Sequence, residues 1–172
     1  MNEWPESGMT RFGLFLFVFF CGFGTAESVP HSLDEAFRRP VALAWASDDL
    51  LAVANRDTGS ISLVDAKKRV VLYEVVVGKS LSSLSSLPGT PFLVSTDEEA
   101  NEFLLLETRG ATLAVRDRIS VPHSPVNALV STDNSFAVIA SLWARQVSLI
   151  RVDVDRGKLF PERVTNLSFP PR

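Results

Sequence analysis

Cysteine and histidine are scarce in this chain. Its 172 residues include one cysteine, Cys21, and two histidines, His31 and His123. One cysteine excludes a disulfide within the chain, and C-x-x-C-H, the pattern for covalent haem attachment, does not occur. A metal site needs three or more converging ligands, whereas we expect His31 in a leader segment and His123 in a loop. The sequence therefore predicts neither a bound metal nor a cofactor.

An excess of basic residues is also missing. The net charge is −3, and the one tight basic cluster, Lys67-Lys68-Arg69, is typical of a solvated hairpin turn. Nucleic-acid-binding domains usually carry a basic patch, so we predict no nucleic-acid partner. The sequence contains no G-x-S-x-G element and no glycine-rich phosphate loop.

The longest uncharged apolar run is too short to cross a membrane. It covers residues 12–23, whereas a membrane-spanning helix needs about 20 apolar residues. Arg11 precedes the run and the small residues Gly24-Thr25-Ala26 follow it, which is the pattern of a signal peptide cleaved after Ala26. We therefore predict that residues 1–26 are a signal peptide. The mature chain is then exported to the periplasm, the cell surface or the medium, without a stable membrane span.

Two details of this segment refine the prediction. Glu3 and Glu6 place acidic charge where a signal peptide is normally basic, and translation from Met9 would remove both, so Met9 is the expected true start. Phe20 precedes Cys21 where a lipoprotein signal has a small residue, which argues against lipidation. Cleavage after Ala26 leaves no cysteine, which excludes thiolate catalysis and zinc–thiolate sites.

Internal repeats begin after a polar leader, residues 27–38. Apolar runs recur in quartets, and the predicted repeats cover about residues 39–78, 79–123 and 124–172. Ile61 and Phe103 begin equivalent runs 42 residues apart, and Val147 follows Phe103 by 44. The runs are separated by Asp, Asn, Ser, Gly and Pro, and no long amphipathic helical pattern follows Ala26. Each repeat is therefore predicted to be four short strands.

Four strands every 40 to 45 residues are typical of a β-propeller blade. A four-stranded antiparallel sheet has two apolar faces, and radial stacking buries each face against the next blade. The continuous apolar runs 50–54 and 136–140 predict strands buried on both faces, and the alternating run 60–65 predicts an outer strand. The predicted fold is all-β: a partial β-propeller of about three four-stranded antiparallel blades.

The repeat resembles the YVTN-type β-propeller family. The first repeat carries the similarity best, as PVALA, then LLAVANRDTGSISLVD, then RVVLYEVVVG, and the third keeps FAVIAS and VSLIRV. The second departs most, with Ser95-Thr96 where the first has Ala54-Asn55. The resemblance covers about residues 39–153 and implies an exported bacterial propeller; relatives of that kind include lactonase-like and cytochrome-associated proteins. It carries no catalytic residue onto this chain.

The predicted blade count leaves a ring incomplete. Residues 27–172 provide about 3.4 repeats, whereas propellers usually close with 4 to 8 blades. Three explanations remain open: a piece of a longer propeller, a ring completed by another copy or another chain, or an open stack. Residues 164–172 are interpreted as the opening of a further blade. We therefore expect another propeller segment or protein chain as partner.

The loops after the second strand of each repeat hold the best candidates for ligand contact. Such loops gather on one face of a propeller, around its channel. The candidate ligand-face residues are Asn55, Arg56, Asp57, Asn101, Trp143 and Arg145. The competing interpretation is structural: turns made by Asn55 and Asp57, and packing of Trp143 between blades. The acidic group Asp97-Glu98-Glu99 with Glu102 is interpreted as a solvated loop, because calcium-loop spacing is absent.

Composition and motifs together favour a non-catalytic binding or scaffolding module, because no catalytic constellation is visible in the sequence. The alternative is part of a lactonase-like or quinoprotein-like enzyme, or of a cytochrome c-linked electron-transfer protein, with active groups outside this chain. Propellers host unrelated activities, so the fold does not choose between them.

Overall fold

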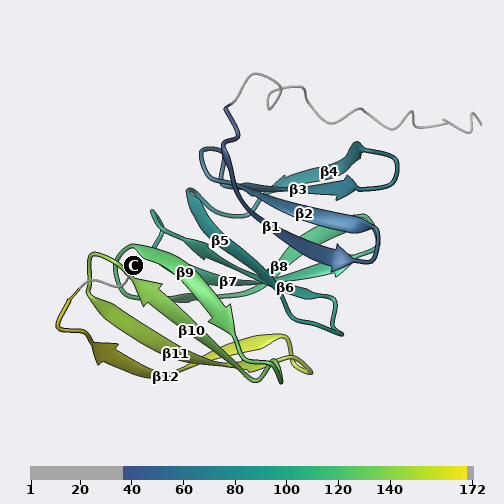
Figure 1. Cartoon of the computed structure of the whole chain (residues 1–172). Coiled ribbons are helices and arrows are strands. Elements are labelled where there is room, and N and C mark those ends of the chain that lie inside the picture. Colours follow the sequence, from purple (N-terminus) through teal and green to yellow (C-terminus); the bar gives the residue numbers. More distant parts are fainter. Residues whose placement is uncertain (1–36, 170–172) are drawn as a thin grey trace, which may run out of the picture. The chain divides into compact units, whose positions relative to one another are not determined.

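The computed structural model describes residues 37–169 as three antiparallel four-stranded sheets, one for each predicted repeat (Figure 1). Blade 1 contains β1 (Pro40–Ser47), β2 (Leu50–Asn55), β3 (Ser60–Asp65) and β4 (Val70–Val76). Blade 2 contains β5 (Leu81–Ser86), β6 (Phe92–Asp97), β7 (Glu102–Arg109) and β8 (Thr112–Ser120). Blade 3 contains β9 (Pro125–Val130), β10 (Phe136–Ser141), β11 (Gln146–Asp153) and β12 (Lys158–Asn166).

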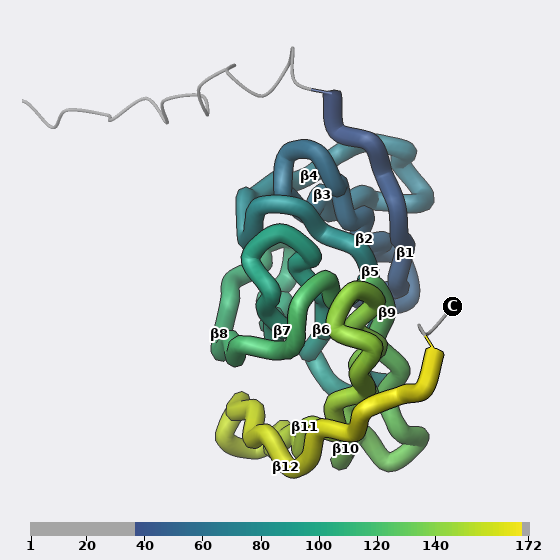
Figure 2. Tube along the Cα trace, turned by 90° about the vertical axis from the view of Figure 1, so that its left-hand side faces the viewer, coloured from purple at the N-terminus to yellow at the C-terminus, as the bar shows by residue number. Residues whose placement is uncertain are grey.

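The all-β partial propeller is confirmed. Each sheet keeps its strands in chain order, and the first strands of successive blades contact one another, β1 with β5 and β5 with β9 (Figure 2). The expected signal peptide, Met9, Cys21, His31 and most of the leader lie outside the described residues. Within residues 37–169 no helix is long and apolar enough to span a membrane.

Blade 2 is buried on both faces, because successive side chains along its inner strands enter two different cores. Leu104 and Leu106 of β7 enter the core shared with blade 1, and Phe103 and Leu105 enter the core shared with blade 3. All four side chains are fully buried. A strand alternates its side chains between faces, so one continuous apolar run serves two interfaces.

The terminal blades each bury one face against blade 2. We call the face of a blade that meets the next blade along the chain its forward face, and the opposite one its backward face. The forward face of blade 1 contributes Ala52, Ala54, Ile61 and Leu63 to the first core, and the backward face of blade 3 contributes Ala137 and Ile139 to the second. The remaining two faces, backward on blade 1 and forward on blade 3, have no blade against them among the described residues.

Three details of the sequence-based fold were wrong. Strand β10 is buried on one face only, because blade 3 is terminal and Val138 stays 40 % exposed. Strand β3 is the third strand of its sheet and mostly buried, while β4 is the outer one. The fourth strand of blade 3 begins at Lys158, so residues 164–166 end β12 and do not open a further blade.

The loops repeat their hydrogen bonds from blade to blade. The residue before each first strand accepts an amide N–H from the loop after the second strand: Arg39 from Arg56, Ser80 from Glu98, and Ser124 from Leu142, at 2.8–3.0 Å. In the same loops Gly59, Asn101 and Arg145 occupy equivalent positions with φ of 60°, 58° and 53°. This shared left-handed turn closes the β2–β3, β6–β7 and β10–β11 hairpins on one end of the blades, which we call the loop face.

Candidate binding surface

Arg56, Glu98 and Ser124 tie the three blades together on the loop face. The guanidinium of Arg56 in blade 1 forms an ion pair with the carboxylate of Glu98 in blade 2. The other Glu98 oxygen accepts a hydrogen bond from the Ser124 hydroxyl, 2.8 Å away, at the start of blade 3. The side chains of Arg56 and Glu98 are only 24 % and 21 % exposed, so water screens this pair less than an open surface pair. One glutamate therefore joins its own β6–β7 loop to the β2–β3 loop and to the segment that enters blade 3.

Asn101 and His123 form the second part of this network. Asn101 Oδ1 accepts the main-chain N–H of Ser124 at 2.9 Å and lies 2.9 Å from Nδ1 of His123. These contacts join the β6–β7 loop to the segment that enters blade 3. His123 lies in a loop between blades, as predicted, and its imidazole is within hydrogen-bond distance of the Asn101 side-chain oxygen.

A cavity of about 280 Å³ opens beside these groups. It is lined by Arg56, Ser80, Glu98, Glu99, His123, Ser124 and Trp143. Trp143 follows β10 and is 72 % exposed, which is unusual for the largest apolar side chain. The cavity therefore combines a fixed charge network with an accessible aromatic ring.

The network lowers the pKa of Glu98. Burial alone would raise it, but hydrogen bonds from Arg56 and Ser124 outweigh burial, and the positive charge of Arg56 adds to them. The ionised carboxylate is therefore the form that the folded protein stabilises.

A pH-dependent contribution to stability follows from this shift. A depressed carboxyl pKa stabilises the fold above the unfolded pKa, and that stabilisation is lost as the pH falls through the folded pKa. We expect Glu98→Gln to be less stable than wild type near pH 7, with the difference shrinking below about pH 4.5. Urea unfolding across the acid range measures it. Glu99→Gln is the matched control because Glu99 is 65 % exposed and lies 4.0 Å from Lys79. A Glu98 effect that is constant with pH would contradict the assignment.

The remaining predicted residues have other surroundings. Asn55 is 2 % exposed and donates hydrogen bonds to Ser60 Oγ at 3.1 Å and Ser62 Oγ at 2.9 Å, so it organises blade 1 internally. Asp57 pairs with Arg39 at 3.5 Å outside the cavity. Arg145 shapes its turn, and its carbonyl accepts the N–H of Leu167 at 2.8 Å. Of the six candidates, Arg56 and Trp143 line the cavity and Asn101 supports it; contact with a ligand stays a prediction.

The sequence-based interpretation of the acidic group was partly wrong. Asp97 is fully buried, and its carboxylate accepts the N–H groups of Lys79, Ser80 and Ala100 at 2.6, 3.1 and 3.0 Å. It therefore anchors the connection from blade 1 to blade 2. No group of three or more metal-binding side chains occurs among residues 37–169.

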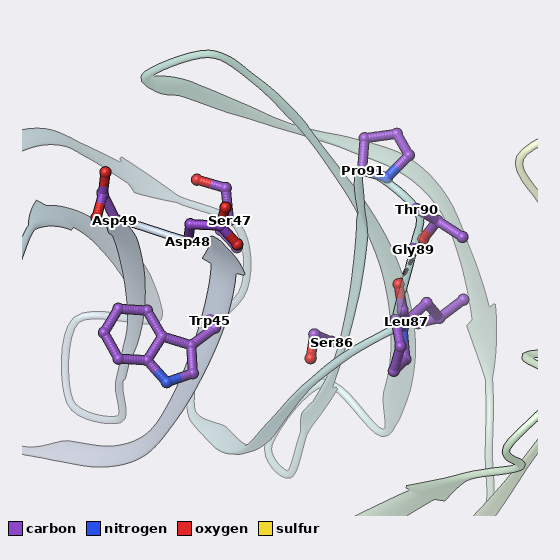
Figure 3. A pocket seen from close by; sticks show the side chains of 11 residues that line it. Trp45, Ser47, Asp48, Asp49, Ser86, Leu87, Gly89, Thr90 and Pro91 are labelled. Atoms are coloured by element: carbon purple, nitrogen blue, oxygen red, sulfur yellow. Dashed lines mark hydrogen bonds between the residues drawn. The ribbon is translucent and has the colours of Figure 1, made fainter.

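A larger opening of about 830 Å³ lies at the other end of blades 1 and 2, between the β1–β2 and β5–β6 turns (Figure 3). The Thr90 hydroxyl locks the second turn by donating to the Leu87 carbonyl at 2.8 Å. Asp49 is engaged by Lys67 at 2.7 Å, and Trp45 of β1 also lines the opening.

Comparisons with known proteins place the fold. No family model matches the chain, and no curated protein matches its sequence. Among solved structures it is similar to Kuenenia stuttgartiensis hydrazine synthase, with 19 % identity and a TM-score of 0.68 over 87 % of this chain and 40 % of that one. It is also similar to the periplasmic gluconolactonase PpgL of Pseudomonas aeruginosa, with 14 % identity and a TM-score of 0.71 over 79 % of this chain and 42 % of that one.

A third similar structure is Sqt1 of Saccharomyces cerevisiae, with 13 % identity and a TM-score of 0.68 over 79 % of this chain and 38 % of that one. Such low identities show the fold alone. The described residues thus have a β-propeller fold, and the chain spans about two-fifths of these neighbours' length. Membership of the YVTN-type repeat family stays a prediction.

Proposed function

We propose that this chain is an exported β-propeller module that acts by binding, with the loop face as the surface that receives a partner protein. One observation carries the proposal: the Arg56–Glu98–Ser124 network fixes three loops beside Trp143, which is 72 % exposed. Tryptophan and arginine are enriched among the residues that dominate binding energy in protein interfaces. A surface that is already ordered loses less entropy on association.

The hydrogen bonding of the cavity favours binding over catalysis. Arg56 and Glu98 satisfy each other across blades 1 and 2, and His123 is engaged by Asn101. Side chains that are bonded to one another in this way hold the loops in position. A general base, by contrast, needs its proton-accepting atom within reach of a substrate. Because Arg56, Glu98 and His123 are bonded to neighbouring side chains, a scaffolding role fits them better than proton transfer.

The proposal also covers where the protein is located and what kind of partner it binds. The apolar run 12–23, followed by Gly24-Thr25-Ala26, supports a signal peptide and hence a periplasmic, cell-surface or secreted location. The partner is another propeller segment or a different protein chain. Amino-terminal sequencing of the exported protein tests the location: a mature chain that begins at Glu27 supports it, and a retained residue 12–23 segment contradicts it.

Partner capture tests the binding surface. The full chain is used as bait on the exported proteins of its host, and bound proteins are quantified by mass spectrometry. Trp143→Ala should lower the recovery of a specific partner at least tenfold, corresponding to a residue worth about 1.4 kcal/mol or more. Leu72→Ala is the control, because Leu72 is 44 % exposed on the outer strand of blade 1. Equal recovery by both variants would contradict the loop face as binding surface.

A lactone assay tests the catalytic alternative. With gluconolactone as substrate, the purified chain should give no hydrolysis above the buffer rate. Turnover that Arg56→Ala abolishes would replace the binding proposal with an enzymatic one.

A further inference from the structure

Strand β4 forms the outer edge of blade 1, and no strand among residues 37–169 pairs with its free side. The N–H of Val77, directly after β4, donates to the Gly59 carbonyl at 2.9 Å, on the side of β3. Successive residues of a strand direct their main-chain groups to opposite sides, so those of Glu74 and Val76 point away from β3. This edge therefore presents main-chain hydrogen-bonding groups to the outside.

The outer strands of the other two blades carry protection that β4 lacks. Charged side chains and proline are common devices against pairing at a sheet edge. Each outer strand has one extra residue at the same point of its register, which is Leu72 in β4, Arg116 in β8 and Glu162 in β12. Blade 2 adds Arg118 on the same strand, and blade 3 adds Pro161. Arg116 and Arg118 are 44 % and 48 % exposed, so only the edge of blade 1 is free of exposed charge.

Glu74 is the one charged residue of β4, and its charge is neutralised within blade 1. Its side chain is 12 % exposed, pairs with Arg38 at 3.0 Å and accepts a hydrogen bond from the Ser60 hydroxyl at 2.7 Å. Val71 and Val76 of the same strand are exposed. Open main-chain groups beside uncharged side chains fit an added strand that is itself extended and uncharged.

Strand β4 is complementary to a second copy of itself. A two-fold axis through Val75 places Glu74 of each copy opposite Val76 of the other, and these are the residues whose main-chain groups point outward. Leu72, the extra residue, then lies opposite Gly78, which has no side chain to obstruct it. Each antiparallel Glu74–Val76 pair exchanges two main-chain hydrogen bonds.

The same self-pairing is unfavourable for β8. Ile119 is the equivalent of Val75, because Ile119 pairs with Phe103 where Val75 pairs with Ile61. A two-fold axis through Ile119 would bring Arg118 of both copies close to the contact and cost the hydration of their guanidinium groups. Self-pairing is therefore specific to the edge of blade 1.

We propose that β4 binds β4 of a second copy of this chain, antiparallel and centred on Val75. The contact uses the same surface on both copies and joins the two blade 1 sheets into one continuous sheet. The inference goes beyond the loop-face proposal and is independent of it, because it uses different residues and a different surface.

Single-cysteine variants in a Cys21→Ser background test the register. Val75 would face itself in a non-hydrogen-bonded pair, whose Cα atoms are about 4.5 Å apart and thus within disulfide range. Val75→Cys should therefore give a disulfide-linked dimer under mild oxidation. Ile119→Cys is the matched control on β8, partly buried like Val75, and should stay unlinked. Equal linkage of the two variants would show random collision and overturn the proposal.

Sedimentation of the full chain measures the association. The wild-type protein should have the mass of two chains, and Val76→Pro should raise the dissociation constant of the dimer at least about tenfold, because proline removes an outward N–H and spares the bonds to β3. Ser120→Pro is the control, since Ser120 is the equivalent outward residue of β8 and Val121 donates to the Asn101 carbonyl at 2.9 Å. Circular dichroism checks that both variants are folded. Equal weakening by both prolines would contradict the β4 contact.

Hydrogen exchange of the wild-type protein provides a readout that needs no variant. The amides of Glu74 and Val76 should exchange more slowly as the dimer forms, while those of Arg118 and Ser120 should not change. A wild-type monomer at all concentrations, or a dimer that leaves Glu74 and Val76 unprotected, would overturn the inference. Pairing of β4 only with a strand of a different protein would overturn it as well. None of these results affects the loop-face proposal, which Trp143→Ala tests separately.

Discussion

Phe103→Ala should lower the free energy of unfolding by about 3–5 kcal/mol, the usual loss for a buried phenylalanine. Phe103 is fully buried in the core between blades 2 and 3, in a strand whose next residue packs toward blade 1. The truncation leaves a cavity between two sheets that are held apart by their other side chains. Because blade 2 belongs to both cores, the loss should appear as one cooperative transition.

The matched control is Val147→Ala, the same strand position in blade 3 but on its open forward face. Chemical denaturation at protein concentrations where the chain is monomeric should show a loss of about 1 kcal/mol or less, as for other partly exposed positions. Equal losses for Phe103→Ala and Val147→Ala would mean that the forward face of blade 3 is covered within one chain. That result would contradict the blade arrangement described above.

Asp97→Ala should have the second largest effect, a loss of about 2–4 kcal/mol. The fully buried carboxylate accepts three main-chain N–H groups, two of them in the connection from blade 1 to blade 2. Alanine leaves these donors without their acceptor, and buried unpaired donors are costly. Gly78 packs directly against this carboxylate, because a Cβ there would lie 2.3 Å from Asp97 Oδ2.

Thermal and urea unfolding measure this loss, with Asp133→Ala as control. Asp133 also accepts hydrogen bonds within a turn, and the hydroxyls of Ser131 and Ser135 lower its pKa to about 2. It is solvent-exposed and joins no two blades, so its removal should cost clearly less than removal of Asp97. Hydrogen exchange should show faster exchange at Lys79 and Ser80 in Asp97→Ala. Unchanged protection there would contradict the anchoring role.

The quartets of strands could be predicted because each core strand carries its own apolar pattern. Residues 50–54 and 102–106 are recognisable without knowledge of their neighbours, and the repeat spacing relates them. Strand β12 was misplaced because Pro161 interrupts its pattern. The structure accommodates Pro161 at an irregularity opposite Ile150, on the outer strand of blade 3, where a missing N–H is tolerated.

The candidate surface was less predictable because its contacts join residues far apart in the chain. Arg56 and Glu98 are 42 residues apart, and their ion pair exists only once blades 1 and 2 are stacked. From sequence, Glu98 looks like part of a solvated acidic loop, and Asp97 looks the same although it is fully buried. The loop position of Arg56 and Trp143 could be inferred from the repeat, whereas the central role of Glu98 could not.

Methyl NMR on Leu104 and Leu105 provides the most direct test that blade 2 lies between blades 1 and 3. These neighbours point to opposite faces of β7 and belong to different cores. The Leu104 methyl groups should show nuclear Overhauser contacts to blade 1, where Leu63 lies in the same core, and those of Leu105 to blade 3, where Ile139 does. Contacts from both leucines to the same blade would contradict the stacked-blade fold on which both proposed surfaces depend.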